Sequence, residues 1–364
     1  MFNNVYRGKT VLVTGHTGFK GSWLAIWLTL LGAKVVGYSL SVYKDRSNFV
    51  ACNLPQKLYA DIRGDIRDLE KIEATIKQYQ PEIIFHLAAQ ALVRTSYQEP
   101  KLTYETNVMG SLNILEAVRK SDCVKTVIMI TSDKCYENVE QIWGYKETDT
   151  MGGYDPYSSS KGCAELMISS YRNSFFNPKD YAGHGKSVVS VRAGNVIGGG
   201  DWSDNRLIPD CIRFIEAGKS IEIRNPNATR PWQHVLEPIS GYLRVGEKMM
   251  EDPVKFATNF NFGPPLSSNK TVWEVVQHVV KIYGRGNVIN ASNPHAVHED
   301  NLLNLDVTKA YTMLDWKPKL SLEDSIKFTV DWYKESLLTK DMYDFCVKQI
   351  EQHSGKGIEC LITR

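Results

Sequence analysis

The sequence has little excess charge of either sign and no long apolar run. Its 43 lysine and arginine residues nearly balance its 41 aspartate and glutamate residues, giving a formal net charge of +2. A protein that binds nucleic acid through bulk electrostatics needs a larger positive excess, and a bilayer-spanning helix needs about 20 consecutive apolar residues. Residues 1–10 contain no apolar segment typical of a secretory signal. We therefore expect no nucleic-acid partner, no membrane association and a cytoplasmic location.

The cysteines form no recognisable framework. The chain has seven, an odd number, and no two of them are arranged as C-x-x-C. Disulfide scaffolds and structural zinc sites both require paired or closely spaced cysteines. The eight histidines show no ligand spacing either. The sequence predicts free thiols in a reducing compartment and no metal site.

Short apolar runs alternate with helical segments over the first half of the 364 residues, of which 43% are hydrophobic. Runs rich in β-branched residues are typical of buried strands, and apolar residues at three- and four-residue spacing indicate helices. The predicted strands are 10–14, 34–38, 83–88, 125–131 and 187–193, and the predicted helices between them include 19–31, 68–80 and 106–120. This alternation predicts an α/β protein with a doubly wound parallel sheet.

A glycine-rich loop lies directly between the first predicted strand and the first predicted helix. It reads T-G-H-T-G-F-K-G, with Gly15, Gly18 and Gly21 at three-residue spacing. One glycine permits a tight turn, another lets the backbone approach a pyrophosphate at the helix N-terminus, and the third allows close helix–strand packing. This context predicts a dinucleotide site, to which Thr17 and Phe19 of the same loop also belong.

The pattern becomes less regular after residue 196. Proline is more frequent, the helices shorten, and one short strand is predicted at 221–224. A further apolar run, 259–263, is expected to return to the sheet. We predict that residues 1–196, rejoined by about 233–264, form a dinucleotide-binding Rossmann domain. Residues 197–232 and 265–350 are expected to form a smaller C-terminal substrate-binding domain.

Two further segments are candidates for cofactor contact. Asp65 and Ile66 would suit contact with an adenine ring, although a helix N-cap ahead of residue 69 explains the aspartate equally well. The strand that ends in Leu87, Ala88 and Ala89 offers small side chains over which a cofactor can lie. Ordinary close packing is the alternative there.

One expected feature is missing. In dinucleotide-binding folds an acidic residue at the end of the second strand binds the ribose hydroxyls. This chain has Y-S-L-S at residues 38–41, followed by Lys44 and Arg46. The second strand therefore leaves NAD and NADP open.

Tyr157 and Lys161 are four residues apart and therefore lie one turn apart on one helix face. The D-P pair at 155–156 predicts the start of that helix. A phenol with a pKa of about 10 is a poor base at neutral pH, but a nearby ammonium favours the phenolate. Ser132 follows the strand 125–131, where it could share a hydrogen bond with the tyrosine and a reacting hydroxyl. Together the three predict hydride transfer to the dinucleotide.

These motifs occur in the order typical of extended short-chain dehydrogenases/reductases, and the chain resembles those that act on nucleotide sugars. The resemblance covers about residues 5–335 and implies NAD as the cofactor, with Lys161 also on the nicotinamide ribose. It further implies a homodimer or dimer of dimers that pairs through helices at 107–119 and 157–171. It is carried by T-G-x-T-G-F-x-G, H-L-A-A-Q at 86–90, T-N-V-x-G-S-x-N-I-L-E-A at 106–117 and Y-x-x-x-K.

More narrowly, longer segments resemble the 4,6-dehydratases of this family, in particular those that take CDP-glucose. The implied reaction oxidises C4, eliminates water across C5 and C6, and returns the same hydride to C6. The implied product is CDP-4-keto-6-deoxyglucose, which belongs to deoxysugar and lipopolysaccharide synthesis. The choice of CDP rests on the resemblance alone. The segments are G-H-T-G-F-K-G-S-W at 15–23, T-S-D-K-C-Y at 131–136, R-A-G-N-V-I-G-G-G-D-W at 192–202 and R-P-W-Q-H-V at 230–235.

The resemblance also implies roles in the elimination. Related sugar dehydratases have T-D-E where this chain has Ser132, Asp133 and Lys134. Asp133 matches the acid that protonates the departing C6 hydroxyl, and a solvated loop carboxylate is the alternative. Lys134 stands where a glutamate base is usual. It could remove the C5 proton only if burial or nearby positive charge made it neutral, and electrostatic support of the enolate is the alternative.

A nucleotide-sugar substrate needs cations for its pyrophosphate and polar groups for its sugar. Asn195 matches the family position that contacts the substrate phosphates, whereas Arg94 and Ser96 are candidates for the sugar pocket. Arg206 and Arg230 are candidate phosphate ligands, with surface arginines as the alternative. The full set of expected substrate residues is Gln90, Arg94, Ser96, Asn195, Arg206 and Arg230.

Two other functions remain open from the sequence. A nucleotide-sugar 4-epimerase, or a dehydratase of another nucleotide sugar, would share the fold and the Ser132, Tyr157 and Lys161 set. An epimerase needs no elimination acid, so Asp133 argues against it. A non-catalytic NAD(H)-sensing protein is the second alternative, but it would not need all three hydride-transfer residues.

Overall fold

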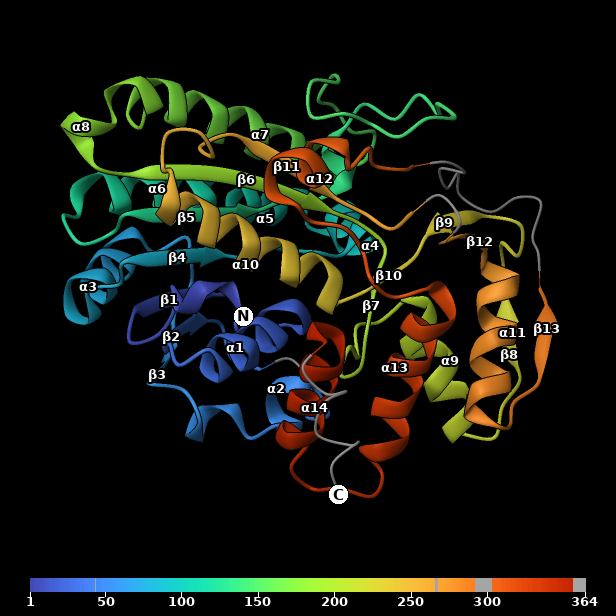
Figure 1. The fold of residues 1–364 in the computed structure, drawn as a ribbon. Coiled ribbons are helices and arrows are strands. Elements are labelled where there is room, and N and C mark those ends of the chain that lie inside the picture. The colour runs from blue at the N-terminus through green and yellow to red at the C-terminus, as the bar shows by residue number, and fades with distance from the viewer. Residues whose placement is uncertain (43, 266–267, 292–302, 356–364) are drawn as a thin grey trace.

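The computed structural model describes residues 1–42, 44–265, 268–291 and 303–355. Its centre is a seven-stranded, all-parallel sheet with the order β11-β6-β5-β4-β1-β2-β3 (Figure 1). The order reverses between β1 and β4, which is the switch point where open parallel sheets bind ligands. The strands are β1 (Thr10–Thr14), β2 (Lys34–Ser39), β3 (Ala60–Arg63), β4 (Ile83–His86), β5 (Thr126–Ile130), β6 (Ser187–Ala193) and β11 (Asn259–Phe262).

The central strands are buried on both faces, because helices cover both sides of the sheet. Successive side chains of a strand point to opposite sides and therefore enter different cores. Val11 and Val13 of β1 belong to one apolar core, and Leu12 between them belongs to the other. This explains why the strands appear as continuous apolar runs in the sequence. One core is covered by α3 (Leu69–Tyr79), α6 (Gly110–Lys120) and α7 (Pro156–Ser174), and the other by α1 (Phe19–Leu30), α10 (Leu236–Glu251) and α14 (Tyr343–Ser354).

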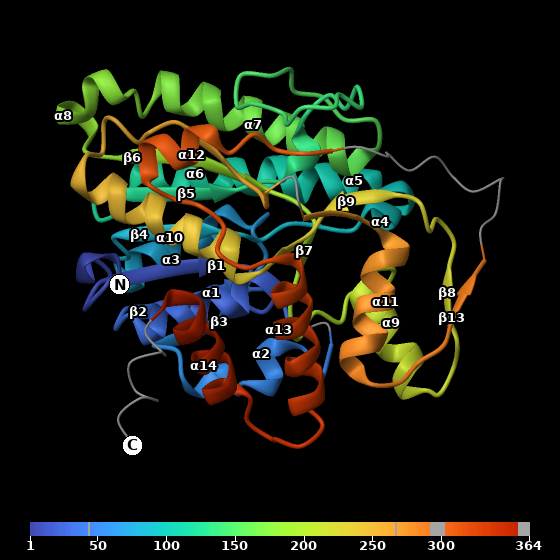
Figure 2. The same ribbon diagram turned by 45° about the vertical axis from the view of Figure 1, so that its right-hand side comes forward.

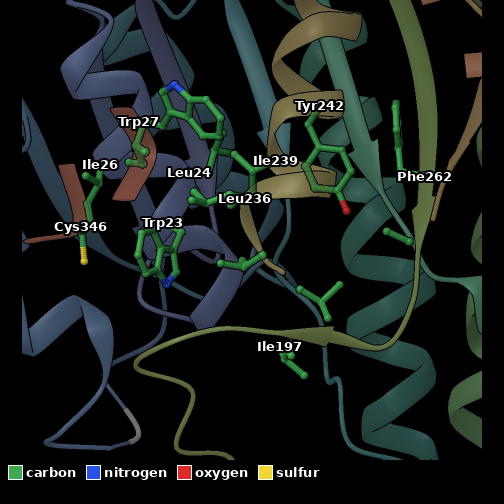
Figure 3. Close-up of a cluster of buried hydrophobic side chains, with 14 of the residues drawn as sticks. Trp23, Leu24, Ile26, Trp27, Ile197, Leu236, Ile239, Tyr242, Phe262 and Cys346 are labelled. Atoms are coloured by element: carbon green, nitrogen blue, oxygen red, sulfur yellow. The ribbon is translucent and has the colours of Figure 1, made fainter. Parts of the chain in front are cut away.

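The second core is built around two tryptophans of α1. Trp23 and Trp27 are fully buried and lie close to Leu236 and Ile239 of α10 (Figure 3). The indole of Trp23 donates to the carbonyl of Gly199 at 2.9 Å, which ties α1 to the segment after β6. This packing fixes the N-terminus of α1 relative to the ends of β5 and β6.

A smaller group of elements lies beyond the carboxyl ends of the sheet strands (Figure 2). There, β8 (Ile221–Ile223) pairs in parallel with β13 (Val288–Asn290), and β9 (Thr229–Pro231) pairs antiparallel with β12 (Asn269–Thr271). The helices of this group are α9 (Leu207–Glu216), α11 (Val272–Tyr283) and α13 (Leu322–Glu335). The pair β7 (Val196–Ile197) and β10 (Gln233–His234) leads from the sheet to this group and back.

The remaining elements are short and connect these layers. They are α2 (Asn48–Ala51), α4 (Val93–Gln98), α5 (Pro100–Tyr104), the π-helical turn η3 (Glu105–Met109), α8 (Tyr181–His184), α12 (Thr308–Leu314) and the 3₁₀ turns η1 (Phe2–Asn4), η2 (Leu54–Gln56), η4 (Asp133–Cys135) and η5 (Pro178–Asp180).

The predicted doubly wound sheet is confirmed, with β1 and β6 at the predicted bounds and the other predicted strands within two residues at each end. The return of the chain to the sheet is also confirmed, because β11 pairs with β6. The predicted helix at 106–120 is formed by η3 and α6 together, and α5 runs into it from residue 100. Strand β3 was not predicted, because its sequence A-D-I-R lacks an apolar run.

The six cysteines of the described residues are free, and Cys360 lies outside them. Within the described part of the chain, no helix is both long and apolar enough to cross a bilayer. No group of three or more metal-ligating side chains comes together among the same residues.

Candidate active site

The glycine loop packs too closely for side chains at two of its three glycines. Gly15 has φ +74°, and a Cβ there would lie 2.7 Å from the backbone nitrogen of Ala88. A Cβ on Gly21 would lie 2.1 Å from the carbonyl oxygen of Gly15. The loop is therefore pressed against the end of β4 and against the first turn of α1, as close backbone approach to a ligand requires.

The N-terminus of α1 is suited to hold an anion. Its N-cap is Gly18, whose lack of a side chain leaves the first backbone N–H groups without a side-chain cap. The first turn contains no acidic residue, and Lys20 lies within it. Because the helix dipole also favours negative charge here, these residues fit the pyrophosphate of a dinucleotide.

Lys20 was not predicted as a site residue, although the structure places it among the charged groups of the site. Burial, the largest cause, lowers the pKa of Lys20 to about 8. The positive charges of Arg206 and Lys161 act in the same direction, and the negative charges of Asp133 and Asp201 oppose them. A lysine within an otherwise uncharged helical turn was the available signal in the sequence.

The end of β2 lacks a carboxylate, but the neighbouring strand β3 supplies one. The hydroxyl of Thr17 lies 2.8 Å from that of Ser39 at the end of β2. Asp61 of β3 is hydrogen-bonded to the buried His16 at 2.7 Å and to Arg63 at 2.6 Å. Asp61 and Arg63 thus put charged groups beside the end of β2, and neither they nor β3 were predicted from the sequence.

Asp65 and Ile66 lie before α3. The carboxylate of Asp65 is held by the guanidinium of Arg67, with a shortest distance of 2.6 Å. Asp65 is not the helix N-cap, since Asp68 caps α3 by accepting from the backbone N–H of Lys71. The side chain of Ile66 is 4% exposed and packs into the core covered by α3 and α6. A contact of either residue with adenine stays a prediction.

The structure brings Ser132, Tyr157 and Lys161 together. Ser132 is the N-cap of the turn η4, directly beyond β5, and Tyr157 and Lys161 lie in α7, whose N-cap is Asp155 as predicted. The Lys161 ammonium nitrogen lies 5.9 Å from the centre of the Tyr157 ring. All three side chains are buried to more than nine-tenths. They are therefore shielded from solvent.

Burial dominates the electrostatics of this set. It raises the pKa of Tyr157 to about 12, while a hydrogen bond with Ser132 and the positive charge of Arg206 oppose the rise. Burial likewise lowers the pKa of Lys161 to about 8, against the opposing negative charge of Glu165. The phenol is thus held neutral in the free protein. A positive charge brought by a bound cofactor would favour its ionisation.

A buried ion pair lies one helical turn beyond Lys161. Glu165, one turn further along α7, accepts from Arg192 of β6 at 2.7 Å, and both side chains are buried. The hydroxyl of Thr131 also donates to Glu165. This network joins α7 to the ends of β5 and β6 and fixes the helix that carries the tyrosine and the lysine.

Asp133 and Lys134 extend the site from the same turn as Ser132. The hydroxyl of Ser132 donates to Oδ1 of Asp133 at 2.9 Å, and the ammonium of Lys134 lies 3.6 Å from Oδ2. Asp133 is 2% exposed, so it is not the solvated loop carboxylate considered above. The side chain of Lys134 is one-quarter exposed.

The expected substrate residues occupy different positions. Arg94 donates to Asn205 at 2.8 Å, and the neighbouring Arg206 pairs with Asp201 at 3.3 Å. Arg94 of α4 is thereby tied to the segment that carries Arg206, and the charge of Arg206 acts on Lys20 of α1. Arg230 lies on β9 and donates to the carbonyl of Thr229.

Three others are more enclosed. Ser96 is fully buried, with its hydroxyl donating to the carbonyl of Val93. The Gln90 side chain bonds to the backbone of Leu92 and to Thr103, so it shapes its own loop. Asn195 has φ +50° in the turn after β6. Substrate contact by these six residues stays a prediction.

A parallel sheet with a glycine loop at its switch point and a buried serine, tyrosine and lysine defines the class of extended short-chain dehydrogenases/reductases. Residues 12–329 match the family model described as GDP-mannose 4,6 dehydratase. The chain belongs to this family.

Two kinds of relatives support this placement. The chain is 48% identical over 350 residues to the CDP-glucose 4,6-dehydratase of Salmonella typhimurium, and the match covers 96% of this chain and 97% of the relative. A UDP-glucose 4-epimerase structure from Thermotoga maritima, with UDP-glucose, matches with a TM-score of 0.73 and 26% identity, covering 90% of this chain and 99% of that one. A UDP-glucose 4-epimerase structure from Thermus thermophilus in complex with NAD matches with a TM-score of 0.74 and 25% identity. This match covers 89% of this chain and 99% of that one.

Proposed function

We propose that this protein is an NAD-dependent CDP-glucose 4,6-dehydratase, a lyase that forms CDP-4-keto-6-deoxyglucose and water. The observation that carries the proposal is the 48% identity to a CDP-glucose 4,6-dehydratase over nearly the whole length of both chains. The buried Ser132, Tyr157 and Lys161 set and the adjacent Asp133 supply the groups that the two half-reactions need.

In the oxidation, Tyr157 takes the proton of the C4 hydroxyl, and Ser132 shares a hydrogen bond with both oxygens. Lys161 holds positive charge next to the phenol and favours its ionised form. The glycine loop and the N-terminus of α1 would hold NAD, which would supply the hydride acceptor for C4 and the hydride donor for C6. Because the sheet, α1 and α7 exclude water from this point, the ketone is protected until elimination.

In the elimination, Asp133 donates its proton to the C6 hydroxyl, which leaves as water. The new C4 ketone makes the C5 proton acidic. Lys134, on the same turn, removes that proton as a neutral amine and, once protonated, carries positive charge beside the enolate. Its Nζ lies 3.6 Å from Oδ2 of Asp133, so the acid and Lys134 are neighbours in the site.

The charged groups around the site can hold the rest of the substrate. Arg206 and Lys20 lie close enough for their charges to interact, and we propose that Arg206 binds the substrate pyrophosphate. Asn195, Arg94, Arg230, Gln90 and Ser96 are the other substrate residues of this proposal. We further propose that residues 197–232 and 265–350 form the substrate-binding domain.

The location, oligomeric state and pathway of the protein are also proposals. We infer a cytoplasmic homodimer, or a dimer of dimers, that supplies deoxysugars for lipopolysaccharide. The family resemblance supports this setting.

The direct test is turnover of CDP-glucose with NAD in deuterated water. We expect a 4-keto-6-deoxy product with deuterium at C5 and the original C4 hydrogen at C6. A 4-epimer as the product would instead support the epimerase function. Competition among CDP-, dTDP-, UDP- and GDP-glucose then tests the choice of base, with CDP-glucose expected to give the highest kcat/KM.

A further inference from the structure

The oxygen of Asp133 that faces away from Ser132 has no hydrogen-bond partner among the described residues. This atom, Oδ2, is buried, and its carboxylate lies directly against Gly194, where an added Cβ would be 1.9 Å from Oδ2. The nearest cation, the ammonium of Lys134, lies 3.6 Å away, beyond hydrogen-bond distance. A buried carboxylate oxygen without a donor is rare in native proteins.

Two other buried polar atoms nearby are also without partners. The side-chain amide of Gln233 donates to the carbonyls of Gly194 at 3.0 Å and Phe262 at 3.2 Å, yet its oxygen Oε1 has no donor. The hydroxyl of Tyr242 is fully buried and unpaired. The ring of Tyr242 packs edge-on against Phe262, with centres 5.8 Å apart, and Figure 3 shows the two side by side.

The charge of Asp133 acts on the phenol of Tyr242. Burial raises the pKa of Tyr242, and the negative charge of Asp133 raises it further. Helix α10, which carries Tyr242, packs against β5 and β6, the strands that lead into Asp133 and Gly194. The phenol hydroxyl of Tyr242 and the carboxylate of Asp133 are therefore close enough for their charges to interact.

We propose that Tyr242 is a positioning residue that anchors the acid of the elimination step, through one ordered water shared by Tyr242 Oη, Asp133 Oδ2 and Gln233 Oε1. This water accepts from the phenol and donates to the carboxylate and to the amide oxygen. It satisfies all three buried atoms with the three hydrogen bonds that a buried water typically makes.

The proposed water determines which oxygen of Asp133 carries the transferable proton. With Oδ2 held as an acceptor, the transferable proton of Asp133 sits on Oδ1, on the side of Ser132 and the substrate. A donor to the carboxylate also stabilises its ionised form, so proton release to the C6 hydroxyl becomes easier. Other groups that face Asp133 are Lys134 and Cys135 on its own turn, Lys20 on α1 and Tyr157 on α7.

The inference rests on the proposed dehydratase function and is tested with Tyr242→Phe, which removes only the hydroxyl. Single-turnover kinetics separate the oxidation, seen as the rise of reduced-nicotinamide absorbance, from the elimination, seen as its decay. We expect oxidation at the wild-type rate and elimination slowed about tenfold. The alkaline limb of the elimination rate should move up by about 0.5–1 pH unit, because the acid keeps its proton more tightly.

The matched control is Tyr6→Phe, which removes a buried hydroxyl that donates to the carbonyl of Leu243 on the same helix. It should leave the pH limb in place, since Tyr6 contacts no group of the site. A slower elimination in Tyr242→Phe without a shift of the limb would indicate a purely structural role and overturn the proposal. If the wild-type enzyme gives no 4-keto-6-deoxysugar, the proposed function fails instead.

A second measurement covers the case in which Tyr242→Phe lowers stability. In an Asp133→Asn background, adding Tyr242→Phe should slow elimination by less than about twofold, because both changes act through one group. Multiplicative effects in the double variant would contradict the inference.

Discussion

At the residue scale, the site keeps charged groups where burial disfavours them. Lys161 is 6% exposed, and its nearest negative charges only partly offset the cost of burying an ammonium. Residues selected for chemistry often reduce the stability of the fold. Lys161 allows this cost to be measured.

We expect Lys161→Met to abolish C4 oxidation and to raise the free energy of unfolding at pH 7 by about 2–3 kcal/mol. Folding lowers the pKa of Lys161 from 10.5 to about 8, so between these values the unfolded chain binds the proton more tightly. Stability of the wild type therefore rises with pH across this window, and the full cost is present below it.

Urea unfolding of both proteins at pH 7 and pH 10.5, without added cofactor, checks this. The difference in the free energy of unfolding between variant and wild type should be smaller at pH 10.5 than at pH 7. The exposed Lys101→Met serves as the control and should change stability little at either pH. A Lys161→Met protein less stable than the wild type at pH 7 would show that the ammonium contributes contacts beyond its charge.

The acid gives a second prediction at this scale. Asp133→Asn keeps the shape of the side chain and its contact with Gly194 but cannot donate a carboxyl proton. We expect C4 oxidation to persist while elimination falls by about 10²–10⁴-fold, so that reduced nicotinamide accumulates in single-turnover experiments. Elimination at the full rate would rule Asp133 out as the acid.

The sequence predicted those site residues whose neighbours are close in the chain. Tyr157 and Lys161 share one helix face, and Ser132 and Asp133 share one turn, so their spacing was informative. The charges of Lys20 and Tyr242 interact with Asp133 although the three residues lie on α1, α10 and η4, far apart in the chain. Contacts of this kind depend on tertiary structure, which no local pattern encodes.

At the element scale, the glycine loop depends on the distance between backbones. The backbone just beyond β4 lies against the loop, so Gly15, the first residue after β1, has no room for a side chain. The strand and helix on either side were predictable from apolar periodicity. By contrast, β3 is an edge strand of half-buried residues, and half-burial leaves little periodic signal.

We expect Gly15→Ala to weaken NAD binding by at least about tenfold, because its Cβ would collide with the backbone of Ala88. The control is Gly8→Ala. Gly8 has a similar φ of +77°, but no atom lies within 4 Å of an added Cβ. Both variants carry the strain of a left-handed residue, and only Gly15→Ala carries the collision.

Isothermal titration of each variant with NAD separates the two effects. An equal loss of affinity in both variants would mean that backbone strain, rather than close approach, governs the loop.

At the scale of the whole molecule, one outer face carries apolar side chains that the chain itself does not cover. Met109 of η3 is 49% exposed, Leu166 of α7 is 60% exposed, and Phe175 beyond α7 is 48% exposed. The helices that are expected to pair in the dimer bury only one side in the internal core, as the buried Leu115 and Val118 of α6 show. The other side suits pairing with a second copy.

We therefore expect Leu166→Glu to shift the protein towards monomer, because it places a charge in the proposed interface. Sedimentation velocity at several concentrations measures this shift. Leu338→Glu is the matched control, since Leu338 is 84% exposed and lies after α13, away from α7. The interface would lie elsewhere if both variants sediment as the wild type does.

The position of β11 at the sheet edge has a consequence for synthesis on the ribosome. Strand β6 is buried along its full length, yet its outer partner is made from residues 259–262, after 65 further residues of chain, 194–258. Until those residues emerge, the growing chain presents an apolar strand with unpaired backbone groups, a surface prone to aggregation. A nascent chain stopped between β6 and β11 should therefore depend on chaperones, whereas one extended past β11 should not.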